Sequence, residues 1–544
     1  MIQSPVMTGS RRLVVPGTIV VSAGILFLAL NAAVLVALAC HFIVYLRYAI
    51  SAVNYRYELF EPEGIVWQQA MLIPGPRMYG DITHYPFIVF HYPPVYHLVV
   101  RGLAALGADP LAAGRAISLL ATLLTGGVVA SLTFRATRPE VGRSAGLIGA
   151  AVGALTFFCF YPVVMMSPLM RSDMPAIGLS FLGVWCALKG VNRVWPLYAA
   201  TLLFVLAAFT KQTCVVAPLA TMAVLWLVNP GRTTRVCCLG LVLSCAVLAV
   251  MESITSGGFL RHLVLYNINR FSLRLMADQI IEQSPQFIFV GLALVSLVCV
   301  WRRLSRRGNW TSFASFRADL AARGDVRIIA IVTVYLGLST CSLITLGKSG
   351  GGLNYFVEWM AVLSVLIGAL SAFLVRRELA AGWRGAGRGT ILAGCLVPVL
   401  ILLQMRILPA SWDFGAADAV RTRQLDDLVV RIRDARKPVL SEDMVLLMRA
   451  GKEVPWEPAI FTELADTGRW DERLIIDLIR SHAFAFVITR ENDDRYTAGV
   501  RDAIRTAYPR AEKYAGRTVR QPPATENQGQ EPPFPSERDG QPLR

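Results

Sequence analysis

The sequence has little charge. Only 17% of its 544 residues are Asp, Glu, Lys or Arg, whereas 55% are hydrophobic. Its mean hydropathy is +0.51. A chain of this length that folds in water carries more charge, so the composition excludes an ordinary soluble protein and indicates that lipid is the solvent.

Three further signals are missing from the sequence. The ten cysteines all lie in or beside apolar segments, which excludes a disulfide framework or a thiolate metal site in the polar regions. The glycine-rich stretch 347–353 lacks the spacing of a Walker loop, so ATP binding is not supported. The net charge of +16 comes from basic residues between apolar segments, which is typical of membrane orientation, and we expect no nucleic-acid partner.

Apolar runs are abundant, and they predict an α-helical polytopic membrane protein. A helix needs about 20 apolar residues to cross about 30 Å of hydrocarbon. The first run follows Arg11 and Arg12 and exceeds a signal-peptide core, so we expect it to be retained. The sequence predicts eleven crossings, at 14–45, 112–134, 145–167, 173–190, 195–210, 213–229, 235–253, 284–301, 327–347, 354–375 and 390–408.

The shorter apolar segment 95–107 decides the predicted topology. It has thirteen residues with Arg101 near the middle, which favours a helix lying along the interface rather than a span. The basic loops at 135–143, 189–193, 231–235, 301–310 and 376–388 then all fall in the cytoplasm. The same count places 46–111, 254–283, 348–353 and everything after 409 outside the cytoplasm. We expect the protein to lie in a bacterial inner or plasma membrane.

The polar carboxyl-terminal part predicts a second domain. Residues 1–409 would form the membrane domain, with 46–111 as its first external loop, and 410–517 a small soluble α/β domain. Short buried strands are expected within 437–448 and 483–489, and a helix within 471–481. Residues 518–544 have too few apolar side chains to build a core, so we expect disorder there.

The first external loop carries a cluster of carboxylates. Glu58, Glu61 and Glu63 lie within six positions, and Pro62 suits the first turn of a helix. Glu63 then falls in that turn, where unpaired N–H groups favour an ionised carboxylate. Such a group is a candidate general base, and the alternative is a helix cap solvated at the interface.

Other polar and aromatic side chains crowd the same loop. Pro93 and Pro94 stiffen its approach to the membrane. Asp81 is a second candidate catalytic carboxylate. The candidate substrate-binding residues of this loop are His84, Tyr85 and Tyr92.

Cations are predicted on the same external face. Arg171 and Asp173 stand at a helix end, where they either bind substrate or form a simple orienting ion pair. Lys211 lies against the positive-inside trend, which suggests an anionic partner. The remaining candidate substrate-binding residues are Arg270 and Arg274 in the 254–283 loop, and Lys348, Asn354 and Tyr355 in or beside a glycine-rich loop that could cradle phosphate.

A carboxylate opposite cations suits transfer of a sugar from a lipid-linked phosphate to a hydroxyl. The base takes the acceptor proton, and the cations stabilise the departing phosphate. A phosphate leaving group needs no proton donor, unlike the leaving group of a glycosidase.

The order of several motifs resembles a known family. YPPVYHL, AAGRAISLLATLLTGGVVA, MRSDMPAIGLSFLGV, AAFTKQTCVVAPLA and GKSGGGLNYFVEW follow a long first span and an acidic loop. This order is similar to that of membrane-embedded GT-C glycosyltransferases of the protein O-mannosyltransferase and lipid A aminoarabinose transferase type. The resemblance covers most of 14–409.

The resemblance implies an inverting transferase with a polyprenyl-phosphate sugar donor and a lipid, glycan or protein acceptor on the extracytoplasmic side. It implies that Lys211 and an arginine of the 261–274 segment hold the lipid phosphate. Family members carry an Asp early in the first loop, whereas here no Asp occurs between Met1 and Gly80.

The matching position carries Glu61-Pro62-Glu63. We expect Glu63 to be the base, because it precedes a glycine as in an EG-type variant, and Glu61 is the second choice. Asp81 would orient the acceptor or, with His84, bind a divalent metal ion. No other cofactor is expected. A transporter and an inactive GT-C-like scaffold are the alternatives.

Overall fold

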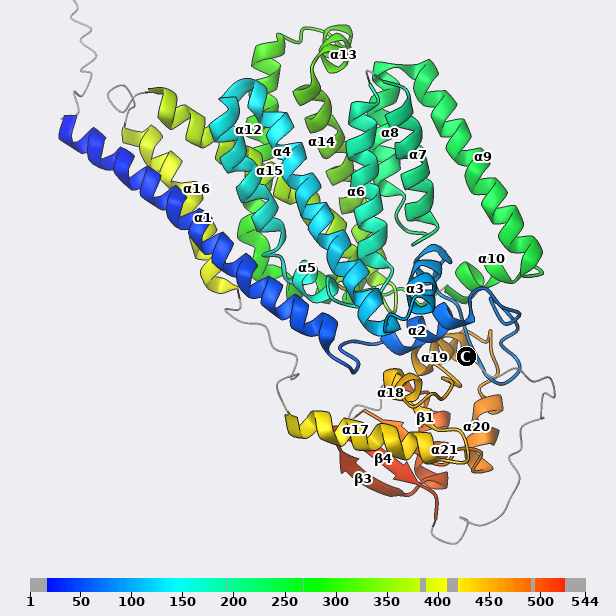
Figure 1. Ribbon diagram of the computed structural model, residues 1–544. Coiled ribbons are helices and arrows are strands. Elements are labelled where there is room, and N and C mark those ends of the chain that lie inside the picture. The colour runs from blue at the N-terminus through cyan, green and yellow to red at the C-terminus, as the bar shows by residue number, and fades with distance from the viewer. Residues whose placement is uncertain are drawn as a thin grey trace, which may run out of the picture.

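The computed structural model describes residues 17–191, 193–267, 269–381, 388–408, 419–490 and 495–523. The predicted tail is therefore described only as far as residue 523. Most of the described chain is a bundle of long helices, and a small domain with a β-sheet lies at one end of the bundle (Figure 1).

Long helices follow the predicted apolar segments closely. Six of the described helices are long and apolar enough to cross a bilayer, and shorter apolar helices accompany them. The chain is an integral membrane protein. The bundle consists of α1 (Gly17–Asn54), α4 (Pro110–Phe157), α6 (Asp173–Lys189), α7 (Trp195–Ala208), α8 (Val216–Val228), α9 (Pro230–Ile254), α12 (Phe287–Gly308), α14 (Gly324–Ser342), α15 (Asn354–Ala381) and α16 (Arg388–Ile407).

Helix α4 contains two of the predicted segments. Gly142 interrupts it with φ 81°, a left-handed conformation that glycine adopts without steric cost. The two halves fold back on each other and pack closely: a Cβ placed on Gly153 would lie 3.1 Å from Oγ1 of Thr133. At its start Asp109 accepts a hydrogen bond from the N–H of Ala112 at 2.9 Å, and Pro110 occupies the first turn.

Helix α15 is the centre of the bundle. The apolar stretch of α15 is 83% buried, whereas that of α9, which lies on the outside of the bundle, is 6% buried. Glycines let α15 approach α4 closely, since a Cβ on Gly149 would lie 2.5 Å from the carbonyl oxygen of Gly368. In lipid the hydrophobic effect does not drive helices together. Small residues let the two backbones approach closely, so that van der Waals packing can stabilise the contact.

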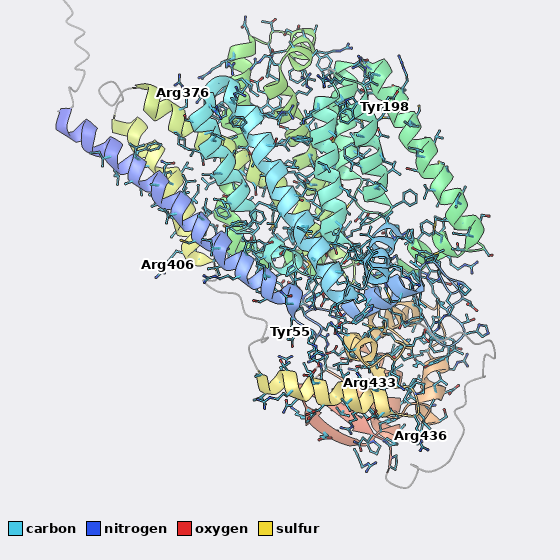
Figure 2. All side chains as sticks on the ribbon, in the orientation of Figure 1. Tyr55, Tyr198, Arg376, Arg406, Arg433 and Arg436 are labelled. Atoms are coloured by element: carbon cyan, nitrogen blue, oxygen red, sulfur yellow. The ribbon has the colours of Figure 1, made fainter. Side chains whose placement is uncertain are left out.

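Most of the short helices outside the carboxyl-terminal domain lie at one end of the bundle, beside that domain (Figure 1). Tyr55 and Arg406 lie towards this end, whereas Tyr198 and Arg376 lie at the other (Figure 2). The short helices are α2 (Glu63–Leu72), α3 (Val95–Ala105), α5 (Tyr161–Met166), α10 (Gly258–Leu263), η1 (Leu265–Asn267), α11 (Leu273–Glu282), η2 (Ser284–Gln286) and η3 (Leu343–Gly347). Helix α3 has 11 residues, so it is too short to cross a bilayer.

The described parts of the basic loops lie at the opposite end, together with α13 (Phe313–Ala322). Arg303 contacts Glu140 at 2.7 Å, and Arg232 donates to the carbonyl of Val191 at 3.1 Å. Segments that the sequence assigns to the cytoplasm therefore lie together, and segments assigned to the outside lie together at the other end.

The carboxyl-terminal domain contains a four-stranded sheet in the order β1-β2-β4-β3. Strand β1 pairs with β2 in parallel, and the other neighbours pair antiparallel. Its strands are β1 (Leu440–Ser441), β2 (Val487–Thr489), β3 (Arg510–Tyr514) and β4 (Arg517–Gln521), and its helices are α17 (Ala419–Asp434), α18 (Met444–Arg449), α19 (Pro458–Asp466), α20 (Arg473–Arg480) and α21 (Ala498–Ala507).

The predicted domain differs from the structure in two details. The boundary at 517/518 cuts strand β4, in which Val519 is fully buried and pairs with Ile488. The segment 437–448 contains the expected buried strand, but β1 has only two residues and helix α18 follows it. The sequence does not predict this helix, because a short buried run has no period that separates strand from helix.

The carboxyl-terminal domain packs directly on α2. Ile65 and Val66 share a hydrophobic core with Met444 and Val445 of α18. The side chain of Gln68 exchanges hydrogen bonds with the backbone of Val454, donating to its carbonyl at 2.9 Å and accepting from its N–H. The first loop and the second domain therefore form one packed unit.

Candidate active site

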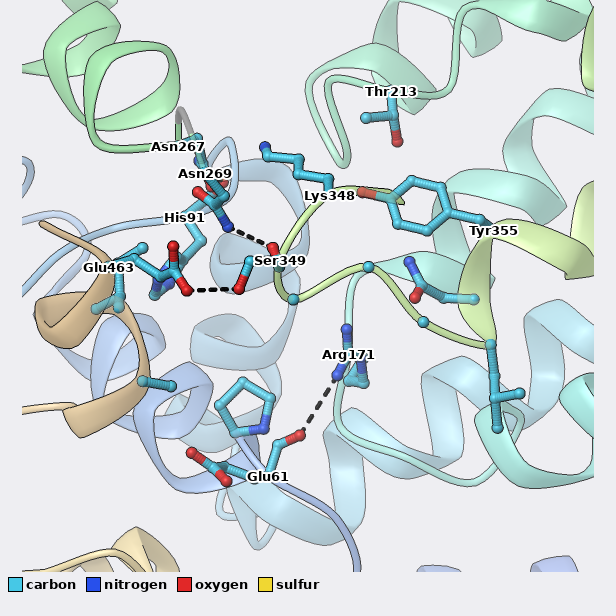
Figure 3. Close-up of a pocket in the computed structure, with 18 of the residues that line it drawn as sticks. Glu61, His91, Arg171, Thr213, Asn267, Asn269, Lys348, Ser349, Tyr355 and Glu463 are labelled. Atoms are coloured by element: carbon cyan, nitrogen blue, oxygen red, sulfur yellow. Dashed lines mark hydrogen bonds between the residues drawn. The ribbon is translucent and has the colours of Figure 1, made fainter. Parts of the chain in front are cut away.

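A cavity of about 770 Å³ lies where the first loop, the ends of the membrane helices and the carboxyl-terminal domain meet (Figure 3). Its lining is drawn from all three parts of the fold. The segments that contribute are 60–62, 91–92, 161–171, 211–213, 267–282, 348–355, 457–463 and Arg495.

Glu61 is the first-loop glutamate that lines this cavity. It lies just before α2, and its side chain is 10% exposed. Oε2 is 3.5 Å from Nη2 of Arg495, too long for a strong hydrogen bond, so the carboxylate can accept one from a ligand. The backbone carbonyl of Glu61 accepts from Nη1 of Arg171 at 3.4 Å, which links the loop to the cations described below (Figure 3).

Glu63 is held quite differently. It starts α2, as expected, but its side chain is fully buried against Arg115 of α4. The guanidinium donates to the carboxylate through Nε at 2.8 Å and Nη2 at 2.6 Å. The backbone N–H groups of Leu59 and Met170 donate to the same two oxygens at 2.9 and 2.8 Å.

This geometry contradicts the expectation that Glu63 is the base. Four donors occupy its carboxylate, and it does not line the cavity. Arg115 also donates to the backbone carbonyls of Ala52 and Tyr57, so the pair joins the end of α1 to α2 and α4. Glu63 is structural, and Glu61 takes its place as the candidate base.

Asp173, at the start of α6, holds two cations side by side. Its Oδ2 accepts from Nε of Arg171 at 2.9 Å, and its Oδ1 accepts from Nζ of Lys211. Asp173 is 1% exposed and does not line the cavity, whereas both cations do. The group carries one net positive charge towards the cavity. The predicted Arg171–Asp173 ion pair is present, and Lys211 forms a second ion pair with the same aspartate.

Aromatic side chains surround this charge. Nη2 of Arg171 lies 3.4 Å from the hydroxyl of Tyr92, and Nζ of Lys211 lies 5.0 Å from the ring centroid of Tyr355. Tyr92, Tyr355 and the neighbouring Asn354 all line the cavity, as the sequence analysis expected of substrate-binding residues. The arrangement can bind an anion beside apolar ring surface.

The glycine-rich loop between η3 and α15 supplies a further cation. Lys348 is half-buried in the cavity wall, and burial lowers the pKa of its ammonium group. An anion would relieve that cost by pairing with the charge. Gly350 has φ 77°, which a residue with a Cβ rarely adopts.

Three backbone N–H groups of this loop are used within the protein. The N–H of Ser349 donates to the carbonyl of Arg270 at 2.8 Å, and that of Gly351 donates to Lys348 at 2.7 Å. The N–H of Lys348 itself donates to Thr345 at 3.1 Å. These three donors cannot bind an anion as the loop stands, whereas the side chain of Lys348 lines the cavity.

The two arginines predicted in the 254–283 loop differ in position. Arg270 lines the cavity and contacts Asp466 at 2.6 Å and Glu463 at 3.5 Å. Its charge is thus shared with the carboxyl-terminal domain. Arg274 is 92% exposed, contacts Asp278 at 3.9 Å and does not line the cavity, so its predicted role in substrate binding is not supported.

Asp81, His84 and Tyr85 also lie outside the cavity lining. Asp81 accepts from the N–H and hydroxyl of Thr83 at 3.0 and 2.6 Å, and the Thr83 hydroxyl bond and the other bonds here lower the pKa of Asp81 to about 2. His84 is 84% exposed and contacts Asp81 at 2.7 Å. Tyr85 packs with Phe87 against the carboxyl-terminal domain.

The metal alternative receives no geometric support. Within the described ranges, no group of three or more His, Cys, Asp or Glu side chains is placed to hold a metal ion. Asp81 and His84 supply two ligands on an exposed surface, which is fewer than a protein metal site usually requires.

The carboxyl-terminal domain contributes residues that the sequence analysis missed. Glu457, just before α19, is 4% exposed in the cavity wall. Burial and the nearby charge of Glu61 raise its pKa well above the ordinary range, against the opposing effect of Arg495 and Arg171. Nε2 of His91 lies 3.6 Å away, and burial lowers the pKa of that imidazole to about 3.

The local sequence gives little sign of this role. Glu457 stands between Trp456 and Pro458, a polar residue in an apolar stretch, which is the one available signal. Gln212 and Asn269 also line the cavity, and polar amides of this kind are common in loops. Only the tertiary structure shows that they line the same cavity.

The fold matches solved structures. One is the crystal structure of ArnT from Cupriavidus metallidurans bound to undecaprenyl phosphate, with a TM-score of 0.52, 13% identity and coverage of 92% of this chain and 100% of that chain. The apo ArnT structure matches with a TM-score of 0.50, 13% identity and coverage of 88% and 96%. No protein-family model and no curated protein sequence matches. The chain has a GT-C-like fold.

Proposed function

We propose, from this GT-C-like fold and the cavity beside it, that the protein is an inverting glycosyltransferase with a polyprenyl-phosphate-linked donor. The observation that carries the proposal is that one cavity brings the Glu61 carboxylate together with Arg171, Lys211 and Lys348. These residues come from four separate segments of the chain. Their chemistry matches that of a base facing an anion site.

In the proposed reaction Glu61 takes the proton of an acceptor hydroxyl. The acceptor oxygen attacks the anomeric carbon of the donor sugar and forms the new glycosidic bond. The bond between that carbon and the phosphate oxygen breaks, and the electron pair leaves with the lipid phosphate. Attack from the face opposite the phosphate inverts the anomeric centre.

The cations stabilise the phosphate as its charge develops. Arg171 and Lys211 are preorganised on Asp173, so they need not reorganise when the bond breaks. Lys348 adds a charge that burial disfavours until an anion arrives.

A lipid-linked donor is consistent with the position of the cavity. It lies at the ends of the membrane helices, where a phosphate can stay at the surface while its prenyl chain remains in hydrocarbon. The similar ArnT structure was determined with undecaprenyl phosphate bound. The basic loops lie at the other end of the bundle, which supports an extracytoplasmic cavity by the positive-inside rule. The acceptor is a hydroxyl of a lipid, glycan or protein.

The direct test is transfer by the purified protein in liposomes. Radiolabelled polyprenyl-phosphate sugars are offered with crude lipid, glycan and peptide acceptors, and labelled products are separated. We expect transfer from at least one donor by the wild type and almost none by Glu61→Gln. An inactive scaffold predicts no transfer by either protein, and a transporter predicts movement of label across the bilayer without a new glycosidic bond.

A further inference from the structure

Four buried acceptor oxygens in the cavity residues lack a hydrogen-bond partner among the described residues. They are Oε1 of Gln212, Oδ1 of Asn269, Oε2 of Glu457 and Oε2 of Glu463. Oε2 of Glu463 forms an ion pair with Nε of Arg270 at 3.5 Å, so the other three acceptors are the ones to explain. A buried polar atom without a partner costs free energy, so several in one place need an explanation.

The orientation of both amides is set by their other atoms. Nε2 of Gln212 donates to the carbonyl of His91 at 3.0 Å, and Nδ2 of Asn269 donates to the carbonyl of Ser349 at 2.6 Å (Figure 3). A carbonyl oxygen can only accept, so these nitrogens cannot exchange places with the oxygens. Both amide oxygens therefore remain to accept a hydrogen bond.

The three acceptors adjoin the proposed phosphate site. Gln212 follows Lys211 directly, and its partner His91 lies 3.6 Å from Glu457. Asn269 binds Ser349, which follows Lys348 and donates to Oε1 of Glu463 at 2.5 Å. The segments that carry the two lysines therefore lie close to Glu457 and Glu463 of the carboxyl-terminal domain.

We propose that Gln212, Asn269 and Glu457 form the subsite for the donor sugar and select a sugar bearing hydroxyl or amino groups over an acidic sugar. Unpartnered acceptors need a ligand that brings hydrogen-bond donors, and a sugar hydroxyl or amine does so. A uronate would place its own carboxylate among these oxygens. The subsite rests on the proposed function, because the sugar must follow the phosphate into the cavity.

Burial explains how a glutamate suits this position. The raised pKa of Glu457 favours the protonated acid, which can donate one hydrogen bond and accept another from hydroxyls. Glutamine has the same shape and capacity, whereas alanine has neither. Glu457→Gln is therefore the conservative variant that should keep sugar binding.

The test is binding by the full chain in nanodiscs, without transfer. Four ligands are titrated: bare polyprenyl phosphate and the polyprenyl-phosphate derivatives of a hexose, an amino-hexose and a hexuronate. We expect the hexose or amino-hexose lipid to bind roughly tenfold more tightly than the bare lipid phosphate, as two hydrogen bonds can supply. The hexuronate should gain nothing.

The variants locate the effect. Glu457→Ala and Gln212→Ala should each reduce the sugar-dependent gain by about threefold to tenfold and leave binding of the bare lipid phosphate unchanged. Glu457→Gln should keep most of the gain. Asp471→Asn, an exposed site in the same domain, is the matched control and should bind like wild type. The two alanine variants lie in different domains, so misfolding of one leaves the other to decide.

The possible failures are distinguishable. If wild type binds bare polyprenyl phosphate but gains nothing from a hexose or amino-hexose, or if both alanine variants keep the full gain, the subsite is wrong and the proposed donor class stands. Tightest binding of the hexuronate also overturns the subsite. If wild type binds no polyprenyl-phosphate ligand, both the proposed function and the subsite are wrong.

Discussion

At the scale of single residues, two glutamates one proline apart have different environments. The Glu63 side chain is buried in a salt bridge with Arg115, whereas Glu61 lines the cavity. The sequence identifies both as candidates and favours Glu63, because helix position and a following glycine are all that the local pattern offers. It cannot identify Arg115 as the partner of Glu63, since that contact spans 52 residues.

Removing the Glu63 side chain should destabilise the protein. Glu63→Ala leaves the Arg115 guanidinium buried without its counter-charge, and breaking such a pair costs about 3–5 kcal/mol. Thermal unfolding in detergent measures this loss. Glu61→Gln is the control, because its side chain has one distant ion pair, and it should unfold close to the wild-type temperature. Equal unfolding of Glu63→Ala and wild type would contradict the structural role.

Lys211 should matter for the lipid phosphate more than for folding. Lys211→Met removes one charge near the developing phosphate charge, while Asp173 keeps Arg171 as a partner. We expect transfer to fall by about 10²-fold, the usual effect of losing one such electrostatic contact. Binding of bare polyprenyl phosphate should weaken in parallel, and Lys211→Arg should restore part of it. Unchanged phosphate binding would remove Lys211 from the site.

Asp81 provides a carboxylate of the same loop that lies outside the cavity. Asp81→Asn should keep the wild-type transfer rate within about twofold, since surface changes of this kind have small effects. Transfer assays with and without a chelator check both this expectation and the metal alternative. Loss of transfer in Asp81→Asn would restore the catalytic role that the sequence suggested.

At the scale of elements, the helices could be predicted from the sequence because lipid imposes a simple length requirement. Each predicted apolar segment contains a helix, and α3 is as short as expected. The small domain was harder, since α18 and β1 are both short and buried on all sides. The strand β4 was assigned to a disordered tail, because one buried residue, Val519, gives too weak a pattern.

The close contact between α2 and α18 should require glycine at position 64, because there is no room for a side chain there. A Cβ on Gly64 would lie 2.4 Å from the carbonyl carbon of Met444, so Gly64→Val forces the carboxyl-terminal domain away from α2. Overpacking of this kind costs about 1–3 kcal/mol. Limited proteolysis after 408 should release the domain faster. Gly102→Ala in α3 has open space around it and should behave like wild type.

At the scale of the whole molecule, the candidate active site is assembled from both domains. Glu61 and the cations come from the membrane domain, whereas Glu457, Glu463 and Arg495 come from the carboxyl-terminal domain. The sequence predicted the first group in part, because unusual charges beside apolar segments are visible locally. The second group could not be predicted, since nothing in the local sequence records which face of the small domain packs on α2.

The orientation of the molecule is a prediction for reporter fusions. Fusions after Gly107 and Leu408 should report an extracytoplasmic position, and a fusion after Arg143 should report a cytoplasmic one, because the basic loops lie at the opposite end from the cavity. Enzymatic reporters active on only one side of the membrane measure this. A cytoplasmic signal after Leu408 would reverse the orientation of the cavity.

If Glu61 removes the acceptor proton beside a lipid-phosphate site, its carboxylate is needed for transfer but not for donor binding. The decisive comparison is between reconstituted wild type and Glu61→Gln, offered the same labelled polyprenyl-phosphate sugar and acceptor. We expect transfer by wild type and a fall of about 10²–10⁴-fold in Glu61→Gln, the range for loss of a general base, with donor binding retained. A Glu61→Gln enzyme that transfers sugar at the wild-type rate would contradict it.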